Sequence, residues 1–173
     1  MAERRKAGFF VSVVCLLLLM SSAQVAADAP RGKRTIGETA VIAVEQAGMS
    51  FLARIDTGAR VTSIHAMDVE VKHDAGDDKK DNIGKEVSFT TENERHKWAK
   101  VTTSIVDVAK VRNAQGTEYR YVVELKLKWQ GIEKSALVNL RDRSAMSYKL
   151  LIGRNWLSSD FIVDVDRSEG IIK

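Results

Sequence analysis

The stretch "ARIDTGARVTSIHA", residues 53–66, places Asp56, Thr57 and Gly58 directly after an apolar approach. This order has two interpretations. In an ordinary turn, the Asp and Thr side chains hydrogen-bond to nearby backbone and the glycine adopts a positive φ. In a catalytic loop, the carboxylate acts as a general acid or base. Because three residues alone do not distinguish the two, the decision rests on the remainder of the chain.

Alternating apolar and polar residues predict strands on both sides of this stretch. Val123, Leu125, Leu127 and Trp129 alternate with polar residues, which is the pattern of a half-buried strand. Turn-forming residues such as those of "QG", 130–131, separate such segments. Only "RNWLSS", residues 154–159, favours a short helix. The sequence therefore predicts a mainly β domain with many hairpins.

The first 27 residues have the features of a secretory signal peptide. A basic start at residues 4–6 precedes an apolar core over residues 8–20, and "SSAQVAA", residues 21–27, supplies small residues for cleavage. The apolar core is shorter than the roughly 20 residues that span a bilayer, so cleavage is favoured over an uncleaved anchor. We therefore expect export, to the periplasm, with no stable membrane span in the mature chain. Polar residues 28–35 are expected to form a flexible leader.

Charge and cysteine content restrict the classes of partner and chemistry. The formal net charge of the whole chain is +4, and residues 1–27 contribute three basic side chains and one acid to it, so nucleic-acid binding gains little support. The single cysteine, Cys15, lies in the predicted signal, which leaves no thiol for catalysis or disulfides. "GKRT", residues 32–35, lacks the earlier glycine of a phosphate-binding loop, because that position is Ala27. We expect neither nucleic acid nor ATP as a partner.

A second motif changes the interpretation of the first. "YKLLIGRNWL", residues 148–157, is an apolar strand that runs into Gly153 and a helix-prone segment. "IDTGA" followed about a hundred residues later by "LLIGRNWL" resembles the retropepsin-type aspartic proteases. "DRSAMSYKLLIGR", residues 142–154, and "FIVDVDRS", residues 161–168, resemble a bacterial retropepsin-like group labelled as ATP-dependent zinc proteases. The resemblance implies a single-lobe, closed β-barrel over residues 36–173.

The chemistry of peptide hydrolysis explains why such a protein needs two aspartates. Without a metal or a nucleophile, one carboxylate takes a proton from water while another gives one to the substrate carbonyl. Two carboxylates a few ångströms apart share one proton and supply both functions. Because the chain has one Asp-Thr-Gly triplet, the protease interpretation requires a homodimer with Asp56 from each subunit at a two-fold axis.

The resemblance also implies a role for each residue of the two motifs. Asp56 shares the catalytic proton, Thr57 braces the loops across the dimer, and Gly58 permits close approach of backbone to substrate. A second group is expected to contact the peptide substrate: Ala59, Arg60 and Arg154. A third group is expected to support the site: Gly153, Asn155 and His65.

Two features depart from the retroviral pattern. Where those enzymes carry an acid that pairs with the arginine of "GRN", this chain has Arg60, so Arg154 needs another partner, for which Asp142 is a candidate. No glycine-rich flap is present. The polar segment "KHDAGDDKKDNIGK", residues 72–85, and the hairpin "RNAQGTEYR", residues 112–120, are alternative covers for the substrate.

Two other function classes stay open. The histidines His65, His73 and His96 show no short metal-ligand spacing, so we expect no metal and no cofactor, although a metal-dependent hydrolase is one alternative. The other is a non-catalytic periplasmic module that keeps the fold and binds a peptide or protein. The leading hypothesis is an aspartic endopeptidase that acts on peptides or proteins as a homodimer.

Overall fold

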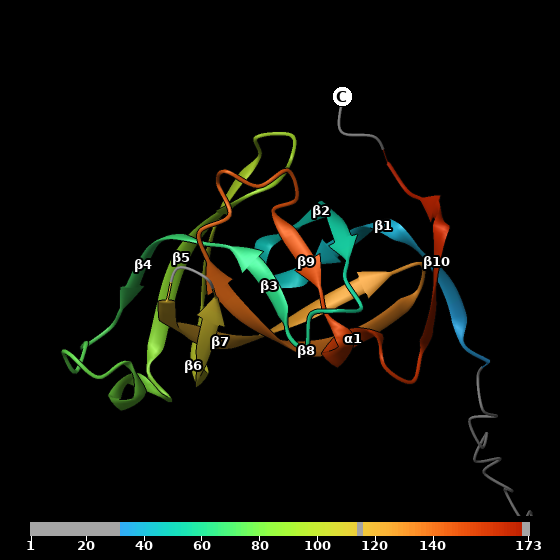
Figure 1. Ribbon diagram of the computed structural model, residues 1–173. Coiled ribbons are helices and arrows are strands. Elements are labelled where there is room, and N and C mark those ends of the chain that lie inside the picture. Colours follow the sequence, from blue (N-terminus) through green and yellow to red (C-terminus); the bar gives the residue numbers. More distant parts are fainter. Residues whose placement is uncertain (1–31, 114–115, 171–173) are drawn as a thin grey trace, which may run out of the picture. The chain divides into compact units, whose positions relative to one another are not determined.

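A computed structural model describes residues 32–113 and 116–170, and strands dominate this part of the chain (Figure 1). The prediction of a mainly β fold is confirmed. The only α-helix in the described residues is α1, Arg154–Leu157, inside the segment where a short helix was expected. The strands are β1 Arg34–Val44, β2 Met49–Ile55, β3 Thr62–His65, β4 Met67–Val71, β5 Glu86–Glu92, β6 Trp98–Asn113, β7 Gly116–Trp129, β8 Ile132–Arg141, β9 Leu150–Ile152 and β10 Phe161–Ser168, with 3₁₀ turns η1 Glu45–Ala47 and η2 Lys79–Asn82.

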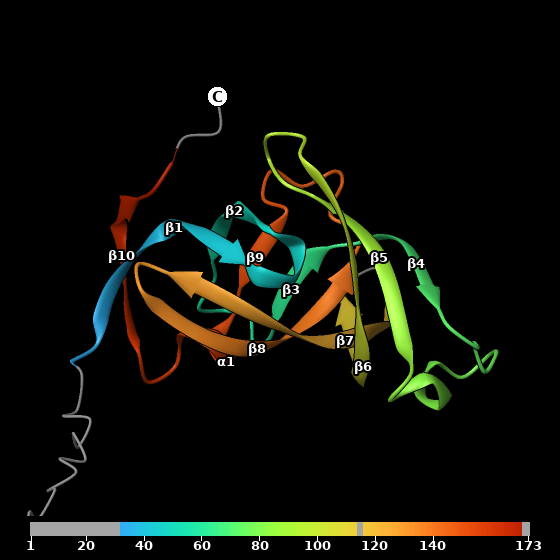
Figure 2. The same ribbon diagram turned by 180° about the vertical axis from the view of Figure 1, so that it is seen from behind.

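The strands form one sheet, part of which closes on itself. Their order is β10-β1-β2-β9-β3-β8-β7-β6-β5-β4. An additional pairing of β1 with β7, through Ala43↔Lys128 and Val44↔Leu127, joins β1, β2, β9, β3, β8 and β7 into a ring of six strands. β4, β5 and β6 extend from one side of this ring and β10 lies on the other, as both views show (Figures 1 and 2).

Alternation along the strands places the core inside the ring. In β7, Val123, Leu125, Leu127 and Trp129 are all buried, as the period-two pattern predicts. The β7–β8 hairpin turns at Gln130 and Gly131, which both have positive φ as a two-residue type I′ turn requires. This turn sets the register in which Trp129 pairs with Ile132.

The structure describes part of the predicted leader but not the predicted signal peptide. The predicted signal peptide, residues 1–27, lies outside the described residues. β1 begins at Arg34, so the last two residues of the predicted leader, 28–35, belong to a strand that pairs in parallel with β10. No helix in the described part of the chain is long and apolar enough to cross a membrane.

An aromatic cluster anchors α1 to β10. Trp156 is fully buried and stacks on Phe161 with 4.7 Å between ring centroids, and Phe161 also meets the edge of Trp129 at 5.6 Å. These contacts fix α1, which directly follows β9, against the core.

Replacement of Trp156 by alanine should therefore destabilise the whole fold. We expect Trp156→Ala to lower the free energy of unfolding by about 3–5 kcal/mol, because a buried aromatic side chain leaves a cavity. Chemical denaturation monitored by circular dichroism measures this. Trp98→Ala is the matched control, since Trp98 is 52% exposed, and its effect should stay below about 1 kcal/mol. Equal effects of the two substitutions would contradict the packing described here.

Candidate active site

Asp56 lies at the end of β2 with its carboxylate already oriented by its own loop. Its backbone N–H donates to the carbonyl of Ile152 in β9 at 2.9 Å. Its Oδ1 accepts the N–H groups of Gly58 at 2.9 Å and Ala59 at 3.1 Å. Among the described residues no protein donor reaches Oδ2. One oxygen of the half-buried carboxylate is thus occupied by the backbone, while the other is free to exchange a proton.

The segment after β9 crosses directly over the Asp56 loop. The N–H of Arg154 donates to Ala59 O at 2.9 Å, and that of Asn155 donates to Arg60 O at 3.1 Å. Gly153 makes the crossing possible, because a Cβ there would lie 2.7 Å from the carbonyl carbon of Val61. A side chain at this position would therefore push the two segments apart.

Asn155 ties the crossing to two further strands. Its Oδ1 accepts both the N–H and the hydroxyl of Thr62 in β3, each at 2.9 Å, and its Nδ2 donates to Leu137 O in β8 at 2.7 Å. The N–H of Gly153 donates to the Thr62 hydroxyl at 3.1 Å. Sequence reasoning missed Thr62. No local pattern in the sequence distinguishes Thr62 from other strand residues.

Arg154 finds its partners in the loop backbone rather than in an acid. Its Nη1 donates to Thr57 O at 2.7 Å and Gly58 O at 3.1 Å. The expected pairing with Asp142 is wrong, because Asp142 accepts the N–H of Ser144 at 2.8 Å and lies beside His65. The two carbonyl dipoles replace a carboxylate as the counter-charge for this guanidinium. The guanidinium consequently braces the loop through Nη1, and its contact with a substrate stays a prediction.

The remaining predicted residues surround the loop at different depths. Thr57, Gly58 and Arg60 are exposed, and Ala59 is half-buried. Arg60 forms no ion pair within the described residues. His65, by contrast, lies at the end of β3, fully buried, where its Nδ1 accepts the N–H of Arg143 at 2.9 Å. His65 thus supports the β8–β9 loop, residues 142–149, and does not contact Asp56.

Two buried arginines that sequence reasoning did not select lie near the site. Arg143 is 5% exposed and Arg120 is 6% exposed. The pKa of Arg143 falls to about 10, first because its side chain is buried and then because Arg141 and Arg120 repel its charge. The carboxylate of Asp56 opposes this shift, which places the Arg143 guanidinium within electrostatic reach of Asp56. Buried cations of this kind call for an anionic partner.

The outer face of the sheet next to the loop is polar and buried. Ser63 pairs with Leu151 in β9 and with Asn139 in β8, so these side chains share one face, opposite the core residue Ile64. Ser63 Oγ, Asn139 Oδ1 and Arg120 Nε are buried and have no hydrogen-bond partner among the described residues. Buried polar groups without a partner are uncommon in folded proteins.

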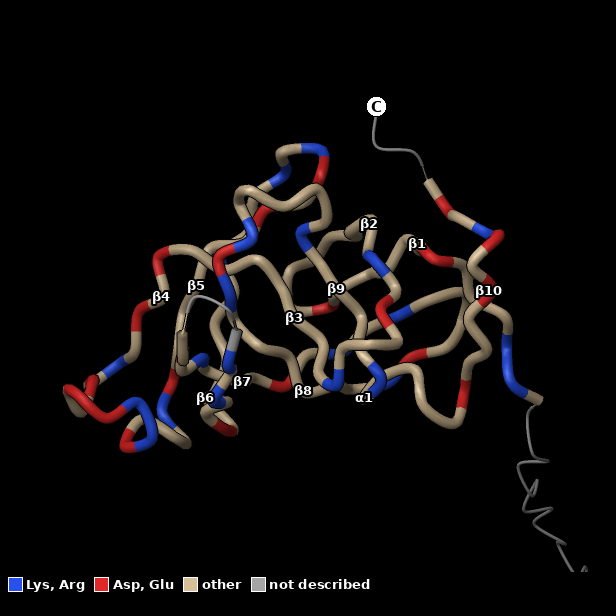
Figure 3. Tube along the Cα trace, viewed as in Figure 1, with Lys and Arg blue, Asp and Glu red and all other residues tan. Residues whose placement is uncertain are grey.

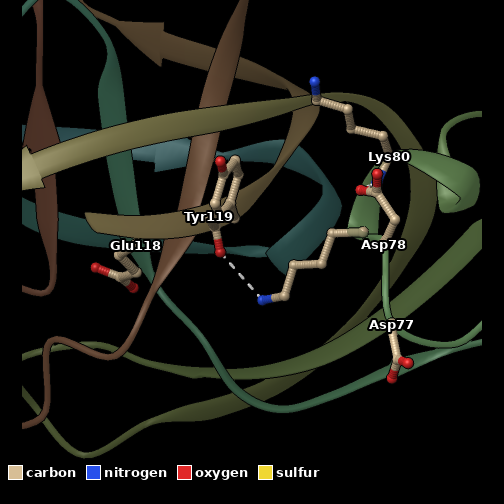
Figure 4. Close-up of a pocket in the computed structure, with 6 residues that line it drawn as sticks. Asp77, Asp78, Lys80, Glu118 and Tyr119 are labelled. Atoms are coloured by element: carbon tan, nitrogen blue, oxygen red, sulfur yellow. Dashed lines mark hydrogen bonds between the residues drawn. The ribbon is translucent and has the colours of Figure 1, made fainter.

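The two candidate covers for the substrate are joined to each other. Asn82 of the 72–85 segment is buried and donates to the Tyr121 hydroxyl of β7 at 2.9 Å. Lys79 donates to Tyr119 O at 3.1 Å, at the rim of a pocket of about 610 Å³ that Asp77, Asp78, Lys80 and Glu118 also line (Figure 4). Lysines and acids alternate along this segment, which reaches out from the ring beyond β4 (Figure 3). The segment and the β6–β7 hairpin therefore form one structural unit.

The three histidines lie in separate places. His65 is buried, His73 is in the 72–85 segment, and His96 is in the β5–β6 turn beside Glu92. Within residues 32–113 and 116–170, no group of three or more His, Cys, Asp or Glu side chains is arranged to hold a metal ion.

Comparisons with known proteins agree with this architecture. Residues 35–173 match the RimB-like family, described as "Retropepsin-like aspartic endopeptidase RimB". A crystal structure of Lpg0085 from Legionella pneumophila, a protein of unknown function, superposes with a TM-score of 0.63 over 79% of this chain and 97% of that one. Because the two are 22% identical, this likeness shows the fold alone.

Curated relatives are much longer proteins. The chain is 29% identical over 120 residues to a "Probable alpha-L-glutamate ligase" of Shewanella pealeana, a match that covers 67% of this chain and 25% of the ligase. A protein of the same name from Desulfotalea psychrophila is 26% identical over 137 residues, covering 76% and 28% of the two chains. The chain thus spans about a quarter of the length of these relatives. The match over residues 35–173, together with the crossing at Asp56, shows that the chain belongs to the RimB-like family of retropepsin-like aspartic endopeptidases.

Proposed function

We propose that the protein is an aspartic endopeptidase whose catalytic dyad consists of Asp56 from two copies of the chain. The observation that carries this proposal is the segment after β9 that crosses the Asp56 loop and donates two backbone hydrogen bonds to it. Two N–H groups of the loop itself hold Asp56 Oδ1 and leave Oδ2 open. An ordinary turn of the same sequence would not need a second segment to cross over and hold it through Arg154 and Asn155.

The dyad explains how one residue type supplies both steps of the reaction. Two carboxylates that face each other across a two-fold axis cannot both ionise, so one keeps a proton that the other lacks. The ionised carboxylate takes a proton from water, the water oxygen attacks the peptide carbonyl, and the protonated carboxylate donates to the carbonyl oxygen. Collapse of the tetrahedral intermediate then breaks the C–N bond as the amine takes a proton back from the dyad.

The homodimer is the part of the proposal that supplies the second carboxylate. Each chain has a single Asp-Thr-Gly triplet, and the loop that carries it is exposed at Thr57 and Gly58. The Thr57 hydroxyl is then available to bond with the partner's loop, while Arg154 holds the Thr57 carbonyl from within the same chain. We place this dimer in the periplasm, on the basis of the signal-like residues 1–27.

The proposed substrate is a peptide or protein with acidic side chains near the scissile bond. Arg143 and Arg120 are buried cations, and Glu118 is the carboxylate that pairs with Arg120. A substrate carboxylate would bring the anion that Arg143 lacks. The names of the longer relatives, which are glutamate ligases, are consistent with a substrate rich in glutamate.

Loss of the Asp56 carboxylate tests the dyad. Asp56→Asn should lower the rate of peptide cleavage by at least about a hundredfold, because an amide replaces the general acid and base. Cleavage of a degenerate peptide library between acid and neutral pH, with and without a chelator, is measured by mass spectrometry. Asp166→Asn, on the exposed face of β10, is the control and should cleave like the wild type.

Three outcomes of that experiment contradict the proposal in different ways. Equal cleavage by wild type and Asp56→Asn would remove Asp56 from the mechanism. Loss of wild-type activity with the chelator would favour a metal-dependent hydrolase. Absence of cleavage, together with a monomer at all concentrations in sedimentation equilibrium, would favour the non-catalytic binding module.

A matched pair of peptides tests the substrate preference. The wild type should cleave a glutamate-containing peptide with about 10–100-fold higher kcat/KM than its glutamine analogue, the range expected for a charge-assisted hydrogen bond. Arg143→Met should abolish most of this ratio by weakening cleavage of the glutamate peptide alone. Arg95→Met, at an exposed position in the β5–β6 turn, should leave the ratio unchanged. A ratio near one for the wild type would exclude the preference.

A further inference from the structure

One residue holds both ends of the β8–β9 loop. The backbone N–H of His65 donates to Lys149 O at 2.7 Å, and the Nδ1 atom of its ring accepts the N–H of Arg143 at 2.9 Å. Between these ends the loop is closed on itself, because Arg143 Nε donates to Tyr148 O at 3.0 Å. The ring of His65 is thus one of the contacts that hold the backbone of Arg143.

The hydrogen bond to Arg143 defines the protonation state of the ring. Because Nδ1 accepts a backbone N–H, the neutral ring carries its proton on Nε2. Nε2 is buried and has no partner among the described residues. The ring as a whole is 0% exposed, and this burial is the main reason why the pKa of His65 lies below its usual value.

A second proton would reverse the role of Nδ1. In the imidazolium both nitrogens donate, so Nδ1–H and the N–H of Arg143 would face each other without an acceptor. The nearest acceptor is Asp142 Oδ1, which is 3.5 Å from Nδ1. The protonated ring would therefore bond to Asp142 and give up Arg143.

Charged groups from the β8–β9 loop and from β5 act on the ring. Asp142, at the start of the loop, and Glu92, at the end of β5, favour protonation of His65. Lys149 and Arg143 oppose it. Lys149 also donates to the carbonyls of Arg143 at 3.3 Å, Ser144 at 2.6 Å and Met146 at 3.2 Å, so loss of the His65 bond must also loosen the contact between Lys149 and Arg143.

We propose that His65 is a positioning residue for Arg143 and an acid-sensitive latch on the β8–β9 loop. The neutral ring keeps Arg143 in place beside the Asp56 loop, and the protonated ring releases it. The direction follows from the protons bound in each state. When the loop is released, His65 regains the pKa of an ordinary histidine and binds a proton more readily than in the closed form. Release is therefore favoured as pH falls below about 6.5, and the open fraction levels off below the lowered pKa of His65 in the closed form.

The latch would lower the proposed peptidase activity at acid pH. Only this consequence rests on the function proposed above. The two Asp56 carboxylates of the proposed dyad hold their shared proton more readily as pH falls. Loss of Arg143 from its position would meanwhile weaken binding of an acidic peptide. The expected result is a rise of KM for the glutamate peptide in acid, with a smaller change in kcat.

Hydrogen exchange of the loop amides tests the latch without substrate. In the full-length wild type, the opening constant of residues 142–148, after correction for intrinsic exchange rates, should rise by up to about tenfold per unit of pH below about 6.5. In His65→Asn the amide oxygen occupies the place of Nδ1 and does not titrate, so the loop should stay protected throughout. His73→Gln, which removes an exposed histidine in the 72–85 segment, is the control and should open like the wild type.

A second variant keeps the proposal testable if His65→Asn does not fold. Asp142→Asn removes the negative charge that stabilises the protonated ring, so the opening transition should move to lower pH. A pH-independent opening constant in the wild type, or the same transition in His65→Asn, would overturn the proposal. These results do not depend on cleavage, so they separate failure of the latch from failure of the protease assignment.

Discussion

The crossing of two chain segments at Asp56 is the constraint on which the site depends. Asp56 and Ile152 are joined by a backbone hydrogen bond, and two further bonds connect Arg154 and Asn155 to the loop. The carbonyl of Val61 occupies the space of a Cβ at Gly153. Because the contact is backbone against backbone, it holds the carboxylate with little freedom, and small errors in such positions cost catalysis heavily.

The electrostatics of the site follow from where its cations are buried. Arg154 is satisfied by two carbonyl oxygens, so the replacement of an acid by Arg60 in the loop does not leave it unpaired. Arg143, in contrast, donates through Nε to a single backbone carbonyl and has a lowered pKa. A buried guanidinium with so few partners favours an anion beside it, which is the basis of the substrate preference proposed above.

Extension of the sheet beyond the ring explains how the polar 72–85 segment is ordered without an apolar core. Asn82 uses both ends of its amide, accepting the N–H of Ala75 and donating to Asp74 and Tyr121. A single buried amide with all of these partners substitutes for packing in a segment of lysines and acids. The segment is thereby coupled to β7, which also carries the buried Arg120.

Much of the fold could be predicted from the sequence because its signals are local. Alternation in β7, the turn at Gln130 and Gly131, and the short helix after Gly153 each depend on neighbours within a few residues, and the structure agrees with them. The Asp56 loop and the crossing segment were also found, since both carry recognisable motifs. The pairing of Arg154 with Asp142 was wrong, because charge in a sequence does not reveal that backbone carbonyls will serve as the partner.

What the sequence by itself determined was therefore the strand pattern, the position of the Asp-Thr-Gly triplet at Asp56 and the motif whose segment crosses it. Only the tertiary structure decided which residues surround that aspartate. Thr62, Ser63 and Asn139 look like ordinary strand residues until β3 and β8 pair in parallel. His65 and Arg143 are 78 positions apart and meet only through the loop that joins β8 to β9. The physical reason is that burial and hydrogen-bond partners arise from contacts between distant segments, and no local pattern records them.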